Sequence, residues 1–363
     1  MQANALLQDK AIDYAHDFHA YSQGVVQRMI AVLNRTDARL TAQLAEALMQ
    51  LDAQTFTVER LEVLLASVKA LNVQAYSAVV AELPPNMRDL ARVETANNTA
   101  QLRAAVPSEI AVRFPIAGVS AEQVYATALS RPFQGRLLKD WAANLEQSRM
   151  TLIRNTVRAG FVEGRTTADI IKTVRGSKAV NFRDGVLQRG RSELAAVVQT
   201  ALSHTAQTAR QASYNANADL VKALSWVSTL DTKTSPMCRI RDGLRYTADT
   251  HKPIGHAIPW GGGPGALHFN CRSVSVPVLK SWKELGINTD EISPGTRASM
   301  DGQVPAEQTY AEWFAKQSAG RQDEILGPAR AALYRSGKMS FGQMYSPNGR
   351  FLTLDQLVKK VGA

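Results

Sequence analysis

The chain has 363 residues, 45% of them hydrophobic, which is enough apolar material for two or more packed units. Its net charge of +10 is spread unevenly: residues 1–100 carry 8 basic and 11 acidic residues, residues 101–200 carry 15 and 8, and residues 201–363 carry 19 and 13. Two cysteines, no apolar run near the roughly 18 residues of a membrane span, and no secretory signal argue against disulfide-built, membrane and secreted classes. We therefore expect a protein made in a reducing cytoplasm, without membrane contact.

The first third of the chain has the apolar spacing of helices. Apolar residues recur at three- and four-residue steps from Leu7 to Leu33, which places them on one face of a helix. We expect Asp37 to cap a second helix. A third should run from about Val58 to Leu83 and end at Pro84-Pro85, because proline cannot continue the hydrogen-bond ladder. Residues 1–110 are thus predicted to form a helical bundle or hairpin.

A second region, residues 111–220, follows a stretch near 105–118 that is interrupted by prolines and glycine. Helical signals resume at Ser120, which stands three residues before a glutamine in the spacing of a capping box. Thr166 should cap a short helix that ends at Gly176. A further amphipathic helix is predicted to lead towards the end of this region.

Basic residues are densest between Arg149 and Arg191, where ten of them stand against three acidic residues. Such a surface could neutralise phosphates and bind DNA in a salt-sensitive way. A solvated helical face and a match to an acidic protein surface are equally good interpretations. The candidate nucleic-acid contacts are Arg149, Arg154, Arg158, Arg165, Lys172, Arg175 and Lys178.

After residue 220 the pattern changes from helix to strand. Residues 222–230 are β-branched and aromatic, and residues 273–278 alternate, with Pro277 indicating an edge strand. We predict a small α+β module over 221–285 and a C-terminal extension over 286–363 with short helices from Tyr310 to Gln317 and from Gln322 to Tyr334. The predicted fold class is α+β and predominantly helical: long N-terminal helices, then a small mixed module, then a short helical tail.

The segment from Trp226 to Arg272 holds the unusual residues. In one interpretation Cys238, His268 and Cys271 bind zinc, because two thiolates and an imidazole suit a tetrahedral site. The paired Cys-x-x-Cys of common zinc sites is missing, so the expected cofactor is none, with zinc as the alternative. A disulfide between the cysteines would require them to meet in the fold.

Two further interpretations compete for the same segment. A metal-dependent nuclease of the His-Asn-His kind is superficially suggested by His256, His268 and Asn270, although the acidic residue that normally precedes the first histidine is replaced by glycine. In the structural interpretation, Asp231 and Asp242-Gly243 shape turns, His268 forms a hydrogen bond that ties the loop to the sheet, and the cysteines are small core residues. The residues alone favour the structural interpretation, so we predict no catalytic residue.

The order of residues in this segment resembles the head-morphogenesis domain of phage Mu F-like minor head proteins. The resemblance rests on a strand with a tryptophan, an Asp-x-Lys-Thr step, a cysteine, an Asp-Gly turn, and a His-x-x-Cys-Arg close, with Ser273 where the family usually has a last cysteine. The residues that match this motif are Trp226, Asp231, Cys238, Asp242, Gly243, His268, Cys271 and Arg272.

The resemblance implies a structural protein of a tailed bacteriophage head, not an enzyme. It implies a minor capsid protein of the virion, near the portal vertex, with the portal protein, the major capsid or scaffolding protein, and packaged DNA as partners. The helices of 1–110 would then dock on the portal or inner capsid, and the basic helices of 111–220 would face DNA or acidic protein. The module of 221–285 would be the head-morphogenesis domain.

Overall fold

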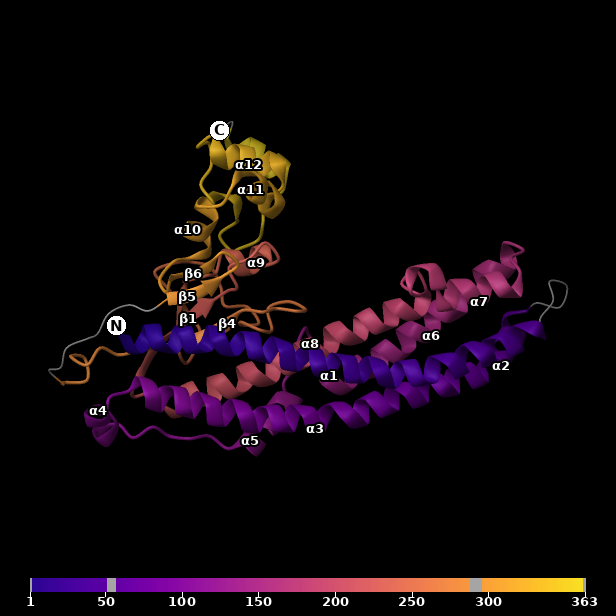
Figure 1. Cartoon of the computed structure of the whole chain (residues 1–363), viewed down its shortest axis with the longest axis horizontal. Helices are drawn as coiled ribbons and strands as arrows, with labels where there is room; N and C mark the ends of the chain where they lie inside the picture. The colour runs from indigo at the N-terminus through magenta and orange to yellow at the C-terminus, as the bar shows by residue number, and fades with distance from the viewer. Residues whose placement is uncertain (1, 51–56, 288–295, 362–363) are drawn as a thin grey trace. The chain divides into compact units, whose positions relative to one another are not determined.

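The computed structural model describes residues 2–50, 57–287 and 296–361, and this part of the chain is mostly helical, with a four-stranded and a two-stranded antiparallel sheet (Figure 1). The predicted fold class is therefore confirmed. The chain divides into two compact units. The bundle unit contains Tyr21–Asp89 and Leu129–Leu202, and the module unit contains Met1–Ala20, Leu90–Ala128 and Ser203–Ala363. These units are defined by contacts, and the four consecutive segments expected from sequence stay a prediction.

The helices that precede the main sheet are α1 (Gln2–Met49), α2 (Val58–Leu64), α3 (Ala66–Ala105), α4 (Ser108–Arg113), α5 (Ala121–Ser130), α6 (Leu138–Val162), α7 (Thr167–Arg175), η1 (Lys178–Val180) and α8 (Val186–Ala216). The main sheet and its loops contain β1 (Val221–Val227), α9 (Pro236–Arg239), β2 (Arg245–Thr247), β3 (Pro253–Ile254) and β4 (Val274–Leu279). The C-terminal part contains β5 (Thr296–Ser299), β6 (Gly302–Pro305), α10 (Tyr310–Ala315), α11 (Ala319–Leu326), α12 (Pro328–Arg335), η2 (Gly342–Met344) and α13 (Leu354–Val361). None of the described helices is both long and apolar enough to span a membrane.

Helix α1 is continuous where the sequence predicted two helices, so the expectation that Asp37 caps a second helix is wrong. Asp37 lies inside α1 and is buried. Its carboxylate accepts hydrogen bonds from Arg149 of α6 and Arg191 of α8. Leu33 and Leu40 on either side are fully buried, so the apolar stripe continues through this position and keeps the helix intact.

The prediction that a helix ends at Pro84-Pro85 is also wrong, because α3 runs through both prolines. A proline inside a helix removes a ladder hydrogen bond and costs about 3 kcal/mol. Leu83 and Met87, four residues apart on either side of the prolines, are both buried. Packing of this apolar face keeps α3 helical through the two prolines. The local effect of proline on the backbone does not predict this tertiary contribution.

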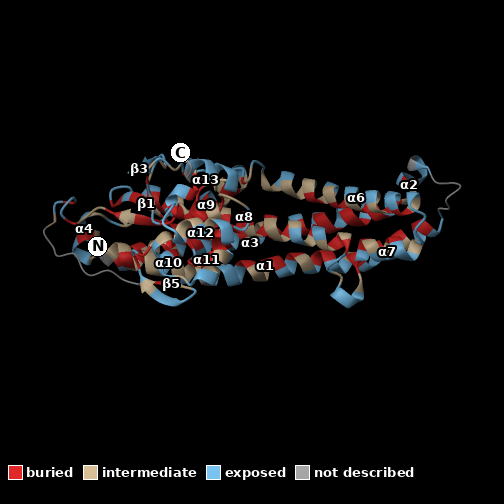
Figure 2. Ribbon diagram, turned by 90° about the horizontal axis from the view of Figure 1, so that it is seen from above, coloured by how far each residue is buried: buried red, intermediate tan, exposed pale blue. Residues whose placement is uncertain are grey.

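The bundle unit closes around an apolar core from α1, α2, α3, α6, α7 and α8, and buried residues form stripes along the long helices in Figure 2. Gly160 of α6 allows close approach of α7, because a Cβ there would lie 2.4 Å from Cγ1 of Ile170. Thr166 caps α7 by accepting a hydrogen bond from the backbone N–H of Asp169 (3.1 Å), and Gly176 follows the last residue of α7 with a φ of 93°. Both predicted ends of this helix are confirmed.

The module unit is built on the antiparallel sheet with strand order β3-β2-β1-β4. Strand β4 lies at the edge, as Pro277 predicted. The side chain of Asn4 in α1 accepts a hydrogen bond from the N–H of Leu279 at the end of β4 (2.7 Å). Tyr214 of α8 donates to the carbonyl of Ser275 (2.9 Å), so α1 and α8, which are far apart in the sequence, both bind the edge strand.

The C-terminal helices form a second core in the module unit, together with Leu230, three residues after the end of β1. Thr309 and Glu312 form a reciprocal capping box at the start of α10. The helix expected from Gln322 to Tyr334 is two helices, because Gly327 has a φ of 79° between α11 and α12. Residues 288–295 of the predicted C-terminal extension lie outside the described residues.

Candidate functional site

Two loops of the module unit bring Cys238, His268 and Cys271 together. Cys238 lies in α9, and its backbone N–H donates to Oγ of Ser235, the residue that caps this short helix (3.3 Å). His268 and Cys271 lie in the loop before β4. Asn270 between them has a φ of 58°, a left-handed conformation that asparagine tolerates, and the N–H of Cys271 donates to the carbonyl of His268 (3.2 Å). This tight turn places both side chains beside Cys238.

The three side chains meet through their metal-binding atoms. The two Sγ atoms are 3.6 Å apart, and Sγ of Cys238 is 3.2 Å from Nε2 of His268. All three potential ligand atoms lie within 4.8 Å of one another. Both thiols are buried and His268 is half-buried. Within the described residues this is the one group of three or more His, Cys, Asp and Glu side chains with such proximity.

The hydrogen bonds of His268 define its tautomer. Nδ1 lies 2.8 Å from the backbone carbonyl oxygen of Phe269, and a carbonyl can only accept, so Nδ1 carries the proton. Nε2 then presents its lone pair to the hydroxyl of Ser235 at 2.7 Å and to the Cys238 thiol. The histidine is hydrogen-bonded, as the structural interpretation expected, but it ties the loop to α9 and not to the sheet.

Electrostatics distinguish the two cysteines. The hydrogen bond with Cys271, together with burial, raises the pKa of the Cys238 thiol. The hydrogen bond from Cys238 and the contact with His268 lower the pKa of Cys271. Burial alone would lower the pKa of His268, but the hydrogen bond and charge of Cys271 raise it overall. Cys271 is therefore the more acidic of the two thiols.

Asp231 and Arg272 form an ion pair next to the Cys238–His268–Cys271 cluster. Arg272 donates from its two terminal nitrogens to the two carboxylate oxygens of Asp231, at 2.7 and 2.9 Å. Asp231 also accepts from the backbone N–H groups of Lys233 and Thr234, which confirms its predicted role in shaping the turn. The bidentate pair joins the loop after β1 to the residue that follows Cys271.

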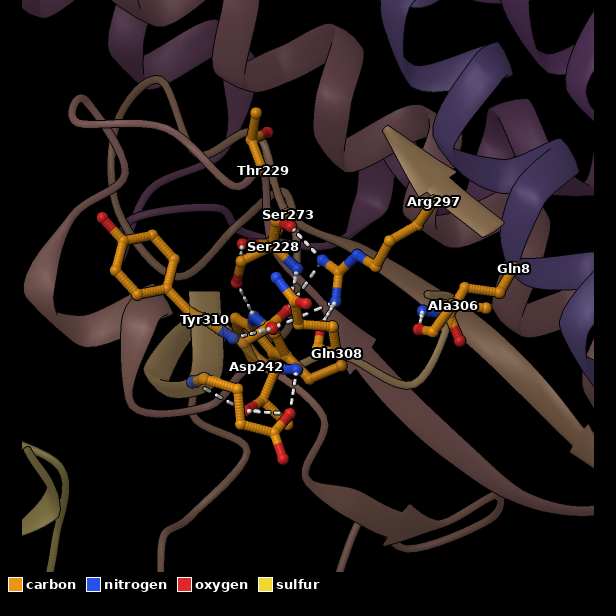
Figure 3. Close-up of polar contacts among 12 residues, drawn as sticks. Gln8, Ser228, Thr229, Asp242, Ser273, Arg297, Ala306, Gln308 and Tyr310 are labelled. Atoms are coloured by element: carbon orange, nitrogen blue, oxygen red, sulfur yellow. Dashed lines mark hydrogen bonds and ion pairs between the residues drawn. The ribbon is translucent and has the colours of Figure 1, made fainter. Parts of the chain in front are cut away.

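Asp242 is the centre of a larger polar network, shown in Figure 3. One of its oxygens accepts from the N–H of Ser228 (2.6 Å) and the other from the N–H of Tyr310 (2.7 Å). Arg297 of β5 donates to both oxygens (3.1 and 3.2 Å) and to the carbonyl of Gln308 (2.9 Å). The sequence predicted only a turn at Asp242-Gly243. The carboxylate also holds the C-terminal part against the sheet.

Trp226 anchors the site in the core. It is fully buried, and its ring packs edge-on against Trp260 at 5.4 Å between centroids. Arg241 lies over the Trp226 ring at 5.7 Å and donates to the carbonyls of Met237 and Pro259. Arg241 therefore fixes the loop that contains Cys238 relative to the loop that leads to His268.

The residues of the nuclease interpretation are not brought together. Nε2 of His256 lies 2.9 Å from the carbonyl of Arg245, and its ring packs against Tyr246. His256 does not belong to the cluster that contains His268. The layout that the sequence suggested for a His-Asn-His site is therefore absent among the described residues.

The seven candidate nucleic-acid contacts fall into different environments. Arg149 is fully buried and bound to Asp37, so it cannot present its guanidinium to a phosphate from this position, and its sequence-based assignment is corrected. Arg154 pairs with Glu62 and Arg165 with Glu163 at the surface. The remaining candidates are exposed: Arg158, Lys172, Arg175 and Lys178.

Several residues that build the site were not singled out from the sequence. Ser235, Arg241, Arg297 and Tyr310 all contact the motif residues. Ser235 could have been found from the sequence, because a serine followed by a proline is typical of the start of a helix. Arg297 and Tyr310 lie more than 50 residues from Asp242 in the chain, and no local pattern marks them as its partners.

Residues 151–276 match the family described as "Phage Mu protein F like protein". The match covers the basic helices α7 and α8 and the whole Trp226–Arg272 segment, so the phage Mu F-like resemblance seen in the motif is confirmed. The match supports a phage head-morphogenesis protein. Comparisons with curated proteins and with solved structures gave no match.

Proposed function

We propose that this phage Mu F-like protein is a minor head protein that associates with the portal and acts in head assembly without catalysing a reaction. The family match supports the role in head morphogenesis. The non-catalytic role is supported by the way the charged motif residues are bound inside the protein, Asp231 by Arg272 and Asp242 by Arg297. A carboxylate saturated with internal donors stabilises loops and has no lone pair directed at a substrate.

The proposed partners are the portal protein and the major capsid or scaffolding protein, and the proposed location is the head near the portal vertex. The N-terminal helices would provide the docking surface. In support, Val73 and Val80 of α3 are both 43% exposed and are seven residues apart, which places them on one face of the helix. Exposed apolar side chains in register are typical of a helix that contacts another protein.

Co-expression tests this assignment. The full-length chain, carrying an affinity tag, would be expressed with the portal protein of the same phage and, in parallel, with its major capsid protein. We expect portal oligomers to co-purify, and Val73→Asp with Val80→Asp to weaken that association. The matched control is Val358→Asp on α13, an exposed valine of the module unit. Capture of the capsid protein without the portal would contradict the assignment.

The exposed part of the basic region is proposed to contact packaged DNA. Arg158 lies on α6, Lys172 on α7 and Lys178 at the start of η1, all in the bundle unit. The tight contact at Gly160 and Ile170 joins α6 to α7. Cations from neighbouring elements of one unit can neutralise several phosphates together. The surface pairs of Arg154 and Arg165 are weak enough to be replaced by phosphate contacts.

Neutralisation of two lysines tests DNA contact. The double variant Lys172→Gln, Lys178→Gln should bind duplex DNA more weakly, and the slope of log affinity against log salt concentration should fall by about 2. The control, Lys252→Gln with Lys338→Gln, removes two exposed lysines of the module unit and should leave the slope unchanged. Equal slopes for both double variants would refute DNA contact by this surface.

A further inference from the structure

We propose that Cys238, His268 and Cys271 form a zinc site, in which two thiolate sulfurs and Nε2 of the imidazole bind the ion and the fourth position is open to water. The proposal goes beyond the role in head assembly, because it assigns a bound metal to the head-morphogenesis domain. It stands on the arrangement of the three side chains and on the groups around them.

Two of the three distances between these atoms are close to those around one zinc ion. With Zn–S near 2.3 Å and Zn–N near 2.0 Å, tetrahedral geometry places two sulfurs about 3.8 Å apart and sulfur and nitrogen about 3.6 Å apart. The two sulfurs are 3.6 Å apart, and the Cys238 sulfur is 3.2 Å from Nε2 of His268. For these two pairs the separations differ from the zinc values by about 0.4 Å or less, and Sγ of Cys271 and Nε2 of His268 lie within 4.8 Å of each other.

The surrounding hydrogen bonds orient the ligands as they do in metal sites. Nδ1 of His268 donates to the carbonyl of Phe269, which leaves Nε2 unprotonated and directed at the thiols. The histidine is therefore held in the tautomer that binds metal before the ion arrives.

Charge balance favours a divalent ion in this place. Two thiolates and one Zn²⁺ form a neutral set, whereas two buried thiolates alone would be costly. Both cysteines are buried, at 2% and 3% exposed, while His268 is half-buried and gives the ion and its water a route from solvent.

The competing fate of the same cysteines is a disulfide. Its sulfurs must approach to about 2.05 Å, which requires the present separation to shrink by about 1.5 Å. A reducing cytoplasm disfavours that oxidation during assembly. The two outcomes are chemically distinct, because metal binding is lost with chelators and the disulfide is lost with reductants.

Cobalt binding to the full-length protein tests the site directly. The protein would be purified in reductant, stripped with a chelator and titrated with Co²⁺, whose thiolate bonds give charge-transfer absorption. We expect one ion per chain, displaced by Zn²⁺. His268→Gln should weaken binding by more than about a hundredfold, since losing a ligand costs more than losing an outer hydrogen-bond partner. His256→Ala, outside the cluster, should bind as the unaltered protein does.

A gain-of-ligand variant separates metal binding from folding. Ser273 is buried two residues after Cys271, and its hydroxyl lies 3.1 Å from that of Ser228, which donates to the carbonyl of Cys238 (3.0 Å), so Ser273→Cys places a third sulfur beside the cluster. This variant should bind Co²⁺ at least about tenfold more tightly, with stronger charge-transfer absorption. Absence of thiolate–cobalt absorption in both the unaltered protein and Ser273→Cys, with the cysteines reactive as free thiols or joined as a disulfide, would overturn the proposal.

Discussion

Each of the two units buries a carboxylate that binds arginine, and the two carboxylates differ in the other groups to which they are hydrogen-bonded. In the bundle unit, Asp37 joins α1 to Arg149 and Arg191, and Nε and Nη1 of Arg149 have no hydrogen-bond partner. In the module unit, Asp242 accepts from two backbone N–H groups and from Arg297, whose terminal nitrogens also bind carbonyls while its Nε lacks a partner. A charge between helices can be replaced by apolar packing, whereas a charge that satisfies backbone groups cannot.

Removing either carboxylate should produce the largest loss of stability. Asp242→Ala leaves Arg297 buried without its partner, and Asp37→Ala leaves Arg149 in the same condition. We expect each to lower the free energy of unfolding by about 3–5 kcal/mol. Urea denaturation measures it, with Asp219→Ala, an exposed aspartate, as a control within about 0.5 kcal/mol of the unaltered protein. Losses no larger than that of the control would show that neither pair stabilises its unit.

Replacing both members of each pair by apolar residues should have opposite effects on stability in the two units. Asp37→Leu with Arg149→Met should recover stability or gain about 1–4 kcal/mol, because α1 and α6 then pack without buried charge and Arg191 can reach solvent. Asp242→Leu with Arg297→Met should stay destabilised, since the N–H groups of Ser228 and Tyr310 lose their acceptor. Equal changes in the free energy of unfolding for the two double variants, measured by urea denaturation, would contradict this difference between the units.

Packing in the bundle unit predicts a smaller effect. Gly160→Ala places a Cβ 2.4 Å from Ile170 and should lower the free energy of unfolding by about 1–3 kcal/mol. Gly320→Ala in α11 meets nothing within 4 Å and should raise it by up to about 1 kcal/mol, because alanine favours helix. Hydrogen exchange on α7 and α11 would locate each change. A stabilising effect of Gly160→Ala would contradict the tight α6–α7 contact.

The smallest predicted effect is the acid dependence of the Asp231–Arg272 pair. Burial would raise the pKa of Asp231, but the hydrogen bonds and charge of Arg272 lower it below its usual value. A carboxyl with a lowered folded-state pKa stabilises the protein above about pH 3.9 and loses that contribution as pH falls through the folded-state pKa. The stability difference between the unaltered protein and Asp231→Asn should therefore shrink below about pH 4. The pair is partly exposed, so we expect a change below about 1 kcal/mol. A difference that stays constant from pH 6 to pH 3 would argue against it.

The sequence predicted the features that depend on neighbouring residues. The ends of α7 at Thr166 and Gly176, the edge position of β4 from Pro277, and the turn at Asp231 all follow from local backbone chemistry. The rare residue types Cys238, His268 and Cys271 could be singled out for the same reason. Their meeting remained one alternative among several until the fold placed α9 beside the loop before β4.

The features that depend on distant residues could not be predicted. Asp37 resembled a helix cap because its partners, Arg149 and Arg191, are 112 and 154 residues away. Pro84-Pro85 resembled a helix end because the packing that keeps α3 intact is tertiary. The basic region resembled one uniform surface, although burial removes Arg149 from it. In each case tertiary burial decided between local alternatives.

Quantitative mass spectrometry of purified phage particles, combined with chemical cross-linking, tests the central claim most directly. If this protein is a portal-associated minor head protein, it should be present in few copies per particle and cross-link to the portal protein. Absence from particles, or cross-links to the major capsid protein in many copies and none to the portal, would contradict that role.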